Sequence, residues 1–221
     1  MNRLFVLLCV TGFLSVSLAA PVRGVVKDNR DGKTYKTVKI GDQTWMAENL
    51  NLHMDESWCY EQKTDNCKKY GRLYTWKKAL KACPTGWHLP TIGEWRTLES
   101  YLTQASREKV GNVLRAKDGW KVKKHKKKKY DEKTGEPIYL DEYETINAGT
   151  DNYGFSALPA GYVDHKGKFV KIKENAVFWS ATKEKGKSKK VLNRQLEYGS
   201  DTFYESRNSM DSGFSVRCVK D

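Results

Sequence analysis

Four cysteines behind an N-terminal export segment constrain this chain more than any other feature. Residues 1–20 have the order of a signal peptide: Arg3 near the start, an apolar run, then small residues at Ala19 and Ala20. Cleavage there removes Cys9 and leaves four cysteines, which are Cys59, Cys67, Cys83 and Cys218. We therefore expect a mature domain beginning near Pro21 that is secreted, periplasmic or held at a cell surface.

An even number of cysteines in an exported chain indicates disulfides. Four cysteines allow three pairings, and the residues alone do not choose between them. Cys59 and Cys67 are close enough to form a short loop, which would leave Cys83 to reach Cys218. In the loop-entropy model the long bridge would contribute about 5 kcal/mol and the short one about 2.5 kcal/mol, both as upper estimates.

A zinc site is the alternative use of these thiols, with His53 or His88 as further ligands. No pair of cysteines has CxxC spacing, and an oxidising compartment disfavours free thiolates. We therefore expect disulfides and neither a metal nor another cofactor.

The formal charge of +13, from 40 Lys and Arg against 27 Asp and Glu, first suggests a nucleic-acid partner. The charge is concentrated, however. Residues 115–136 carry ten basic and four acidic side chains, and residues 183–194 carry six and one. The sequence thus predicts a nearly neutral framework with two cationic loops, and no specific nucleic-acid partner.

The first of these loops contains seven lysines in nine positions, within a region at about 115–150 that differs from the rest of the chain. Like charges at this density do not pack, so we expect a solvated loop or insertion. The lysines are candidate contacts for an acidic polysaccharide, a lipopolysaccharide or nucleic acid: Lys121, Lys123, Lys124, Lys126, Lys127, Lys128 and Lys129. Trp120 and Tyr130 lie in the same polar stretch and are candidates for stacking on a sugar.

The secondary-structure signals alternate between helix and strand. Thr91 and Glu94 form a capping box before an amphipathic helix over residues 92–103, and a weaker helix follows over residues 106–114. Residues 35–47 have the pattern of a β-hairpin around Gly41. Residues 71–76 could be a short strand or lead into a helix over 77–82. Further strands are expected over residues 154–163, 176–182, 192–198 and 213–219.

Five tryptophans in apolar patterned segments are expected in the core: Trp45, Trp76, Trp87, Trp95 and Trp179. The segment Asp28–Gly32 resembles the start of a calcium loop, but Arg30 stands where a third ligand is needed. We interpret it as a turn.

Nine short sequence blocks follow one another along the chain in an order that matches a known domain family. They are DGKTY at 31–35, IGDQTWMAENL at 40–50, WCY at 58–60, NC at 66–67, YGRLYTW at 70–76, CPTGWHLPT at 83–91, YGFSALPAGY at 153–162, FWSAT at 178–182 and GFSVRCV at 213–219. In this order they resemble the Fibrobacter succinogenes major paralogous domain family. The resemblance implies an α+β domain with a C-type-lectin-like fold, distantly similar to the formylglycine-generating enzyme domain.

That fold consists of two helices packed on short, irregular antiparallel strands, and it implies that Cys83 pairs with Cys218. With no internal repeat, residues 21–221 are expected to form one such domain. The resemblance carries no established activity.

The resulting hypothesis is a non-catalytic binding or adhesion module, for which a polysaccharide is one candidate ligand. Glu136-Pro137-Ile138 is the nearest approach to a calcium-dependent sugar triplet and lacks the amide or carboxylate that would hold the ion. The first alternative is polyanion binding by the lysines. The second is an enzyme related to formylglycine-generating proteins. We expect no catalytic residues, because the thiols look committed to disulfides and the histidines have no metal-ligand spacing.

Overall fold

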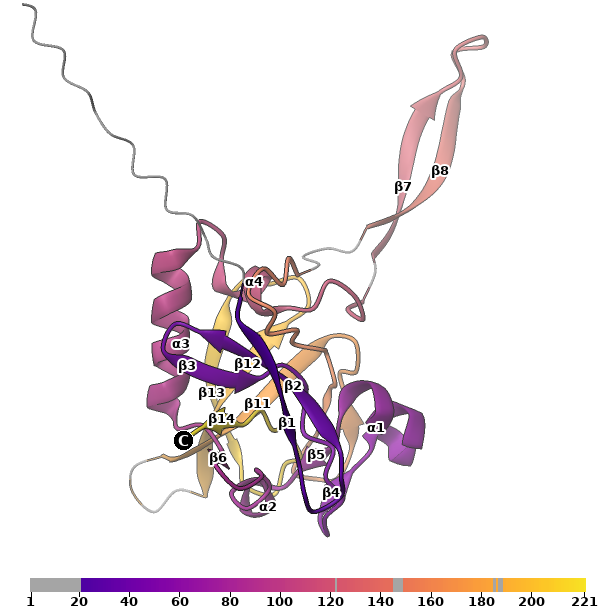
Figure 1. Ribbon diagram of the computed structural model, residues 1–221. Helices are drawn as coiled ribbons and strands as arrows, with labels where there is room; N and C mark the ends of the chain where they lie inside the picture. Colours follow the sequence, from indigo (N-terminus) through magenta and orange to yellow (C-terminus); the bar gives the residue numbers. More distant parts are fainter. Residues whose placement is uncertain (1–20, 122, 145–148, 185, 187–188) are drawn as a thin grey trace, which may run out of the picture.

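The computed structural model describes residues 21–121, 123–144, 149–184, 186 and 189–221, without the side chains of 123–127 and 140–144. The expected signal segment, residues 1–20, lies outside the described residues. The described chain combines several small sheets with a few helices, and one β-hairpin projects from the body (Figure 1).

A five-stranded antiparallel sheet joins the two ends of the described chain. Its order is β1-β2-β3-β14-β6. The strands are β1 (Arg23–Lys27), β2 (Thr34–Ile40), β3 (Gln43–Met46), β14 (Val219–Lys220) and β6 (Trp87–His88). The predicted hairpin is confirmed as β2 and β3: Ile40 pairs with Gln43 across a two-residue turn in which Gly41 has φ of 59°. Such a turn needs positive φ, which glycine adopts without strain.

A second sheet has the order β11-β12-β13, with β11 (Asn175–Lys183), β12 (Lys190–Glu197) and β13 (Phe203–Ser209). The strands expected over 176–182 and 192–198 are thereby confirmed. The sequence analysis missed β13, because this edge strand is polar and its side chains are mostly partly or fully exposed.

Helix α3 (Ile92–Ala105) supplies the centre of the main core. Both hydrogen bonds of the predicted capping box are present at Thr91 and Glu94, and the stripe Ile92, Trp95, Leu98 and Leu102 is buried. The ring of Trp95 lies 4.5 Å from that of Trp45 on β3 and 5.7 Å from that of Phe178 on β11, measured between centroids. The helix therefore packs against residues of both sheets.

Two disulfides close the fold as expected. Cys59 is bonded to Cys67 and Cys83 to Cys218. The short bridge ties η1 (Tyr60–Gln62) to α1 (Thr64–Tyr70), and the long bridge links residues 135 positions apart. The remaining short elements are β4 (Ser57–Trp58), β5 (Leu73–Tyr74), α2 (Trp76–Ala79), α4 (Val110–Leu114), β9 (Tyr162–Val163) and β10 (Phe169–Val170).

Several expectations were wrong in detail. The described residues form four α-helical segments rather than two, and the strands expected over 154–163 and 213–219 shrink to β9 and β14. Both segments lie in the middle of the molecule, where isolated bridges such as Tyr74 to Phe214 and Phe178 to Ser215 replace continuous ladders. Their apolar side chains are buried by packing from several directions, which the sequence pattern cannot distinguish from a strand.

The lysine-rich region is not an irregular loop. Strands β7 (Lys123–Tyr130) and β8 (Pro137–Glu144) pair along their whole length and point away from the body (Figure 1). None of the three hydrophobic core clusters includes a residue of 128–139, the part of the hairpin whose side chains the structure describes.

Candidate functional site

The structure separates Lys121 from the other candidate lysines. Lys123, Lys124, Lys126, Lys127, Lys128 and Lys129 lie on β7. Lys121 lies before the hairpin, where its Nζ is 2.6 Å from Oε1 of Glu174 and 5.8 Å from the ring centroid of Tyr198. Lys121 thus belongs to the attachment of the hairpin and does not extend the row of lysines on β7.

An acidic strand faces the basic one. The register places Lys123 opposite Glu144 and Lys126 opposite Asp141. Over residues 123–144 seven lysines stand against six acidic residues, so the hairpin has a formal charge of +1. The local excess of positive charge over residues 115–136 is therefore largely offset once β8 is counted.

Two arginines counted in the cationic segments are buried in the domain. Arg115 is 0 % exposed, with its guanidinium 5.3 Å from the ring centroid of Trp120 and 3.7 Å from Asp201. Arg194 is 2 % exposed and donates a 2.6 Å hydrogen bond to Glu99. Burial lowers the pKa of both guanidinium groups, against the opposing effect of these carboxylates. Neither arginine can contribute to a cationic surface.

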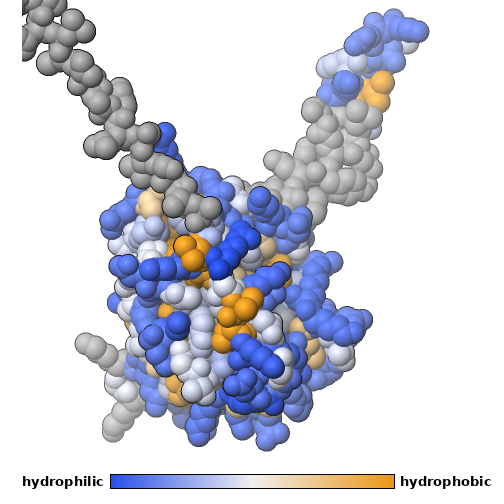
Figure 2. Space-filling model, viewed as in Figure 1, coloured by the Kyte–Doolittle hydropathy of each residue, from blue (hydrophilic) through white to orange (hydrophobic). Residues whose placement is uncertain are grey.

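The outer end of the hairpin presents an aromatic face. Tyr130 and Tyr139 are 59 % and 58 % exposed. The register pairs Tyr130 with Pro137 and Lys128 with Tyr139, so both tyrosines and Lys128 share one side of the ribbon. The ammonium of Lys128 lies 5.0 Å from the ring centroid of Tyr130. We call Lys128, Tyr130 and Tyr139 the tyrosine face; the same end of the arm is largely hydrophilic in Figure 2.

The turn of the hairpin is held by its own side chains. The carboxylate of Asp131 accepts hydrogen bonds from the amides of Lys133 and Thr134, and Gly135 adopts a φ of 70°. These backbone hydrogen bonds lower the pKa of Asp131. A side chain that bonds its own backbone in this way favours a turn, so the tyrosine face borders a defined loop.

The prediction for Trp120 as a sugar-stacking residue was wrong, whereas Tyr130 is exposed as that role requires. Trp120 is 4 % exposed, and its indole lies 3.3 Å from the carbonyl of Ala157, to which it donates a hydrogen bond. Of the tryptophans expected in the core, Trp45, Trp76, Trp95 and Trp179 are buried and Trp87 is partly buried.

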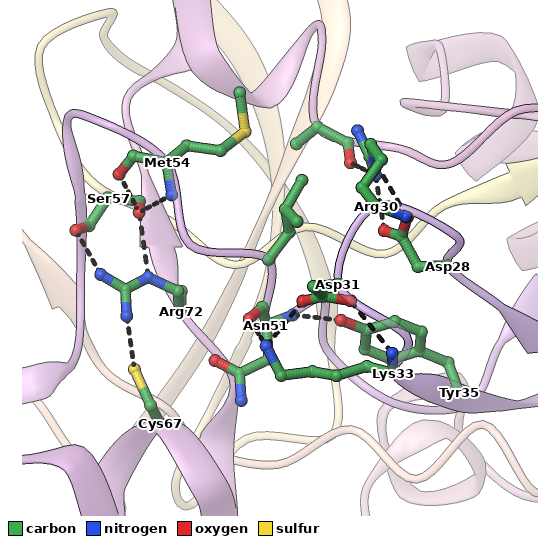
Figure 3. Close-up of polar contacts among 12 residues, drawn as sticks. Asp28, Arg30, Asp31, Lys33, Tyr35, Asn51, Met54, Ser57, Cys67 and Arg72 are labelled. Atoms are coloured by element: carbon green, nitrogen blue, oxygen red, sulfur yellow. Dashed lines mark hydrogen bonds and ion pairs between the residues drawn. The ribbon is translucent and has the colours of Figure 1, made fainter.

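A cleft of about 530 Å³ lies on the body of the domain. Its walls come from β1 and β2, the segment after β3, the end of α1 and the loop Asp151–Leu158. Lys33 at one edge bonds to Asp31 at 2.6 Å and to the carbonyl of Asn51 at 2.9 Å, and Tyr35 accepts from the Asn51 amide (Figure 3). Hydrogen bonds therefore fix the side chains of Lys33 and Tyr35 at this edge of the cleft.

The loop wall of the cleft is held in an unusual conformation. Asp151 and Ser156 have φ values of 50° and 54°. The carboxylate of Asp151 accepts hydrogen bonds from the amide and the hydroxyl of Ser156, at 2.7 Å and 2.5 Å. Burial raises the pKa of Asp151, while these hydrogen bonds and the charges of Arg217 and Arg23 oppose the rise. Backbone strain of this kind is concentrated at functional sites.

Arg217 holds the backbone of this loop through hydrogen bonds from the protein interior. It is fully buried and donates to the carbonyls of Phe155 and Ser156, the latter at 2.8 Å. Its Nε donates to Asn49 at 2.6 Å, and the amide of Asn49 donates to the carbonyl of Tyr70 at 2.8 Å. Burial lowers the pKa of Arg217, although the negative charges of Asp151 and Glu48 partly offset this decrease. Arg217 and Asn49 together therefore join three segments that line the cleft.

His88 on β6 lies between two carboxylates, those of Glu94 on α3 and of Asp221 just after β14. The two ring nitrogens of His88 lie 2.6 Å from Asp221 and 2.7 Å from Glu94. Burial lowers the pKa of His88, but the hydrogen bonds to both carboxylates outweigh it, so the net shift is upward. Both ring nitrogens of His88 are therefore engaged in hydrogen bonds within the domain.

The sequence alternatives that involve metals find no support in the described chain. The thiols that a zinc site would need are in disulfides, and no three His, Cys, Asp or Glu among the described residues are grouped to hold an ion. The segment Asp28–Gly32 is the expected turn, in which Arg30 binds the buried Asp28 at 2.7 Å (Figure 3). In the described part of the chain, no helix has the length and apolar character needed to cross a bilayer.

Residues 38–220 match the model of the Fibrobacter succinogenes major domain. The chain belongs to this family. The matched domain contains both disulfides, the hairpin and Arg217, whereas β1 and the start of β2 precede it. Searches of curated proteins and of solved structures found no match.

Three features of the site were missed by the sequence analysis: Tyr139, the Asp151–Ser156 loop and Arg217. The β-branched and aromatic residues Ile138, Tyr139 and Tyr143, which follow a turn signal at Thr134-Gly135, were a usable signal for a strand opposite the lysines. Arg217 gave no signal, because an arginine in an alternating segment normally faces solvent.

Proposed function

We propose that this chain is an exported, non-catalytic binding module with a C-type-lectin-like fold, and that it attaches to polysaccharide through its tyrosine face. The observation that carries the proposal is the pair of exposed tyrosines, Tyr130 and Tyr139, on one side of a projecting hairpin. Export itself is inferred from residues 1–20 and agrees with the two disulfides.

Tyrosines suit this role because the ring stacks on the apolar face of a sugar while the hydroxyl stays hydrated. Two rings on diagonally opposed positions of adjacent strands are close enough to contact one ligand. Large apolar groups left exposed together on a soluble domain commonly mark an interaction site. The position of the hairpin away from the body lets it approach an extended or insoluble polymer.

Co-sedimentation of the mature protein with insoluble cellulose, chitin and xylan tests the proposal. We expect retention on at least one of these glycans, and about a tenfold loss of affinity in the double variant Tyr130→Ala/Tyr139→Ala. An unrelated basic protein gives the background for adsorption by charge alone.

The matched control is Tyr101→Ala/Tyr204→Ala, which removes two tyrosines that are 40 % and 37 % exposed and lie outside the hairpin. It should bind like the unaltered protein. Absence of binding to all three glycans would contradict the proposal, as would equal losses in the two double variants.

Polyanion binding by the lysines of β7 is the second candidate, and the lysine row itself is the observation in its favour. The acidic residues of β8 weaken it, because they bring the hairpin close to neutrality. Glutamine at the six lysines of β7 tests this without disturbing the buried Trp120. Equal retention of both forms on an immobilised acidic polymer would exclude the lysines.

A further inference from the structure

The cleft on the body of the domain is a second candidate binding site, independent of the hairpin. Its volume of about 530 Å³ lies within the range of small-molecule sites. None of the described side chains of β7 and β8 lines it. What it binds can be inferred from the charges, hydrogen-bond groups and rings in its walls.

Positive charge dominates these walls. Five cationic residues line the cleft against two carboxylates, and the cations are Arg23, Lys33, Lys36, Lys68 and Lys69. Lys33 and Lys68 are already engaged, by Asp31 at 2.6 Å and by Asp65 at 3.0 Å. Within the described chain, no carboxylate lies within 4 Å of the charged nitrogens of the other three.

Both carboxylates of the cleft are also occupied. Glu48 accepts a 2.7 Å hydrogen bond from the backbone amide of Lys36, and Asp151 accepts two from Ser156. The charge of Arg23 acts on Asp151 only at longer range, and within the described chain neither carboxylate forms an ion pair with Arg23 or Lys36 within 4 Å. These two cations are therefore available to a ligand.

The pairing of β1 with β2 places Arg23 and Lys36 together. Arg23 lies opposite Val38, and Lys36 lies opposite Val25, so the two cations occupy diagonal positions on one side of the ribbon. The guanidinium of Arg23 extends over the loop wall, since Nη2 lies 3.4 Å from where a Cβ on Gly154 would stand. A carboxylate in the cleft could thus reach both groups.

The rings in the cleft do not offer a stacking surface. Tyr35 and Tyr70 line it but are only 4 % and 3 % exposed. Recognition must therefore come from polar groups, which include the amide side chain of Asn51 and the hydroxyl of Thr34. The Asp151–Ser156 loop, fixed by Arg217, keeps one wall in place before a ligand arrives.

We propose that this cleft binds a small, hydroxyl-rich carboxylate of the uronic-acid type, with Arg23 and Lys36 holding the carboxylate. The hydroxyls of such a ligand match the amide and hydroxyl groups of the walls. This ligand differs from the polysaccharide proposed to stack on the tyrosine face. The two proposals can therefore be tested independently.

Calorimetric titration of the mature protein with trigalacturonate tests the cleft. We expect saturable binding that weakens with added salt and falls about tenfold or more in Arg23→Gln/Lys36→Gln. The neutral trisaccharide of galactose should not compete. The control Lys27→Gln/Lys39→Gln removes the same charge from exposed positions of the same two strands outside the cleft, and should bind normally.

Equal effects of the two double variants would overturn the proposal, since they would show binding by net charge alone. Competition by inorganic sulfate as strong as that of the uronate would also overturn it, because the cleft would then accept any anion. Tyr130→Ala/Tyr139→Ala should leave this titration unchanged. If uronate binding disappears with the tyrosines instead, the cleft assignment fails while the hairpin assignment survives.

Discussion

At the scale of single residues, Arg217 matters most to the architecture around the cleft. It is fully buried, and its donors serve a side-chain amide and several carbonyls from segments far apart in the sequence. Removing a partner from such a network leaves buried acceptors without hydrogen bonds, and this costs more than the net value of the bonds themselves.

Arg217→Met should therefore lower the free energy of unfolding by about 3 kcal/mol or more, and Arg217→Lys by less, because a lysine retains the charge and some of the donors. Urea unfolding monitored by tryptophan fluorescence measures both. Arg207→Met, at a mostly exposed arginine, is the control. A loss below about 1 kcal/mol for Arg217→Met would contradict the role assigned to this residue.

His88 should give the fold a pH dependence with a definite sign. Its pKa is raised in the folded state by Asp221 and Glu94, despite burial. Its contribution to stability is therefore fully present below the pKa of the unfolded chain, about 6.5, and is lost as the pH rises through the higher folded pKa. Solvent screens this partly exposed group, so the effect should be modest.

NMR titration of the imidazole protons of His88 measures this directly. We expect His88 to titrate above the ordinary range, and His88→Gln to destabilise more at pH 6 than at pH 9. A His88 pKa at or below 6.5 would show that the two carboxylates do not hold the imidazolium.

The sequence could predict those residues whose roles depend on near neighbours. The capping box of Thr91 and Glu94 and the turn at Asp28 are short-range features, and both are confirmed. Arg217 and the Asp151–Ser156 loop could not be found in this way, because their partners lie in segments that only the folded chain brings together.

At the scale of elements, the hairpin of β7 and β8 is the part that the sequence described least well. Its run of lysines indicated a solvated loop, but residues 137–144 pair with them as a second strand. Helix α3 and strand β11 were easier to predict, since the periodic apolar residues of α3 and the continuous apolar run of β11 both report burial directly.

The domain should fold without this hairpin. The hairpin projects from the body, and none of its described side chains, those of residues 128–139, belongs to a core cluster. Replacing residues 123–144 with a short Gly-Ser linker should therefore change the unfolding midpoint by less than about 3 °C. Differential scanning calorimetry measures this. A much larger decrease would mean that the arm supports the body, and glycan-binding data on hairpin variants would then need reinterpretation.

At the scale of the whole molecule, the two disulfides divide the stabilisation unequally. The bridge from Cys83 to Cys218 spans 135 positions, and that from Cys59 to Cys67 spans 8. The entropy lost by the unfolded chain grows with the length of the closed loop. The order of these cysteines in the sequence, together with the family resemblance, was enough to predict both bonds.

Replacing Cys83 and Cys218 by alanine should therefore lower the free energy of unfolding by about 2–5 kcal/mol, and replacing Cys59 and Cys67 should cost less. Urea unfolding of both double variants gives the comparison. A greater loss for the short bridge would show that local packing around α1, rather than loop entropy, determines its contribution.

The central claim is that the tyrosine face of the hairpin binds polysaccharide. The most direct measurement follows the ring protons of Tyr130 and Tyr139 by NMR while a soluble oligosaccharide of the retained glycan is added to the mature protein. We predict shifts of these two rings that saturate with the ligand, while the rings of Tyr101 and Tyr204 stay unchanged. Saturable binding that leaves Tyr130 and Tyr139 unshifted would contradict the account.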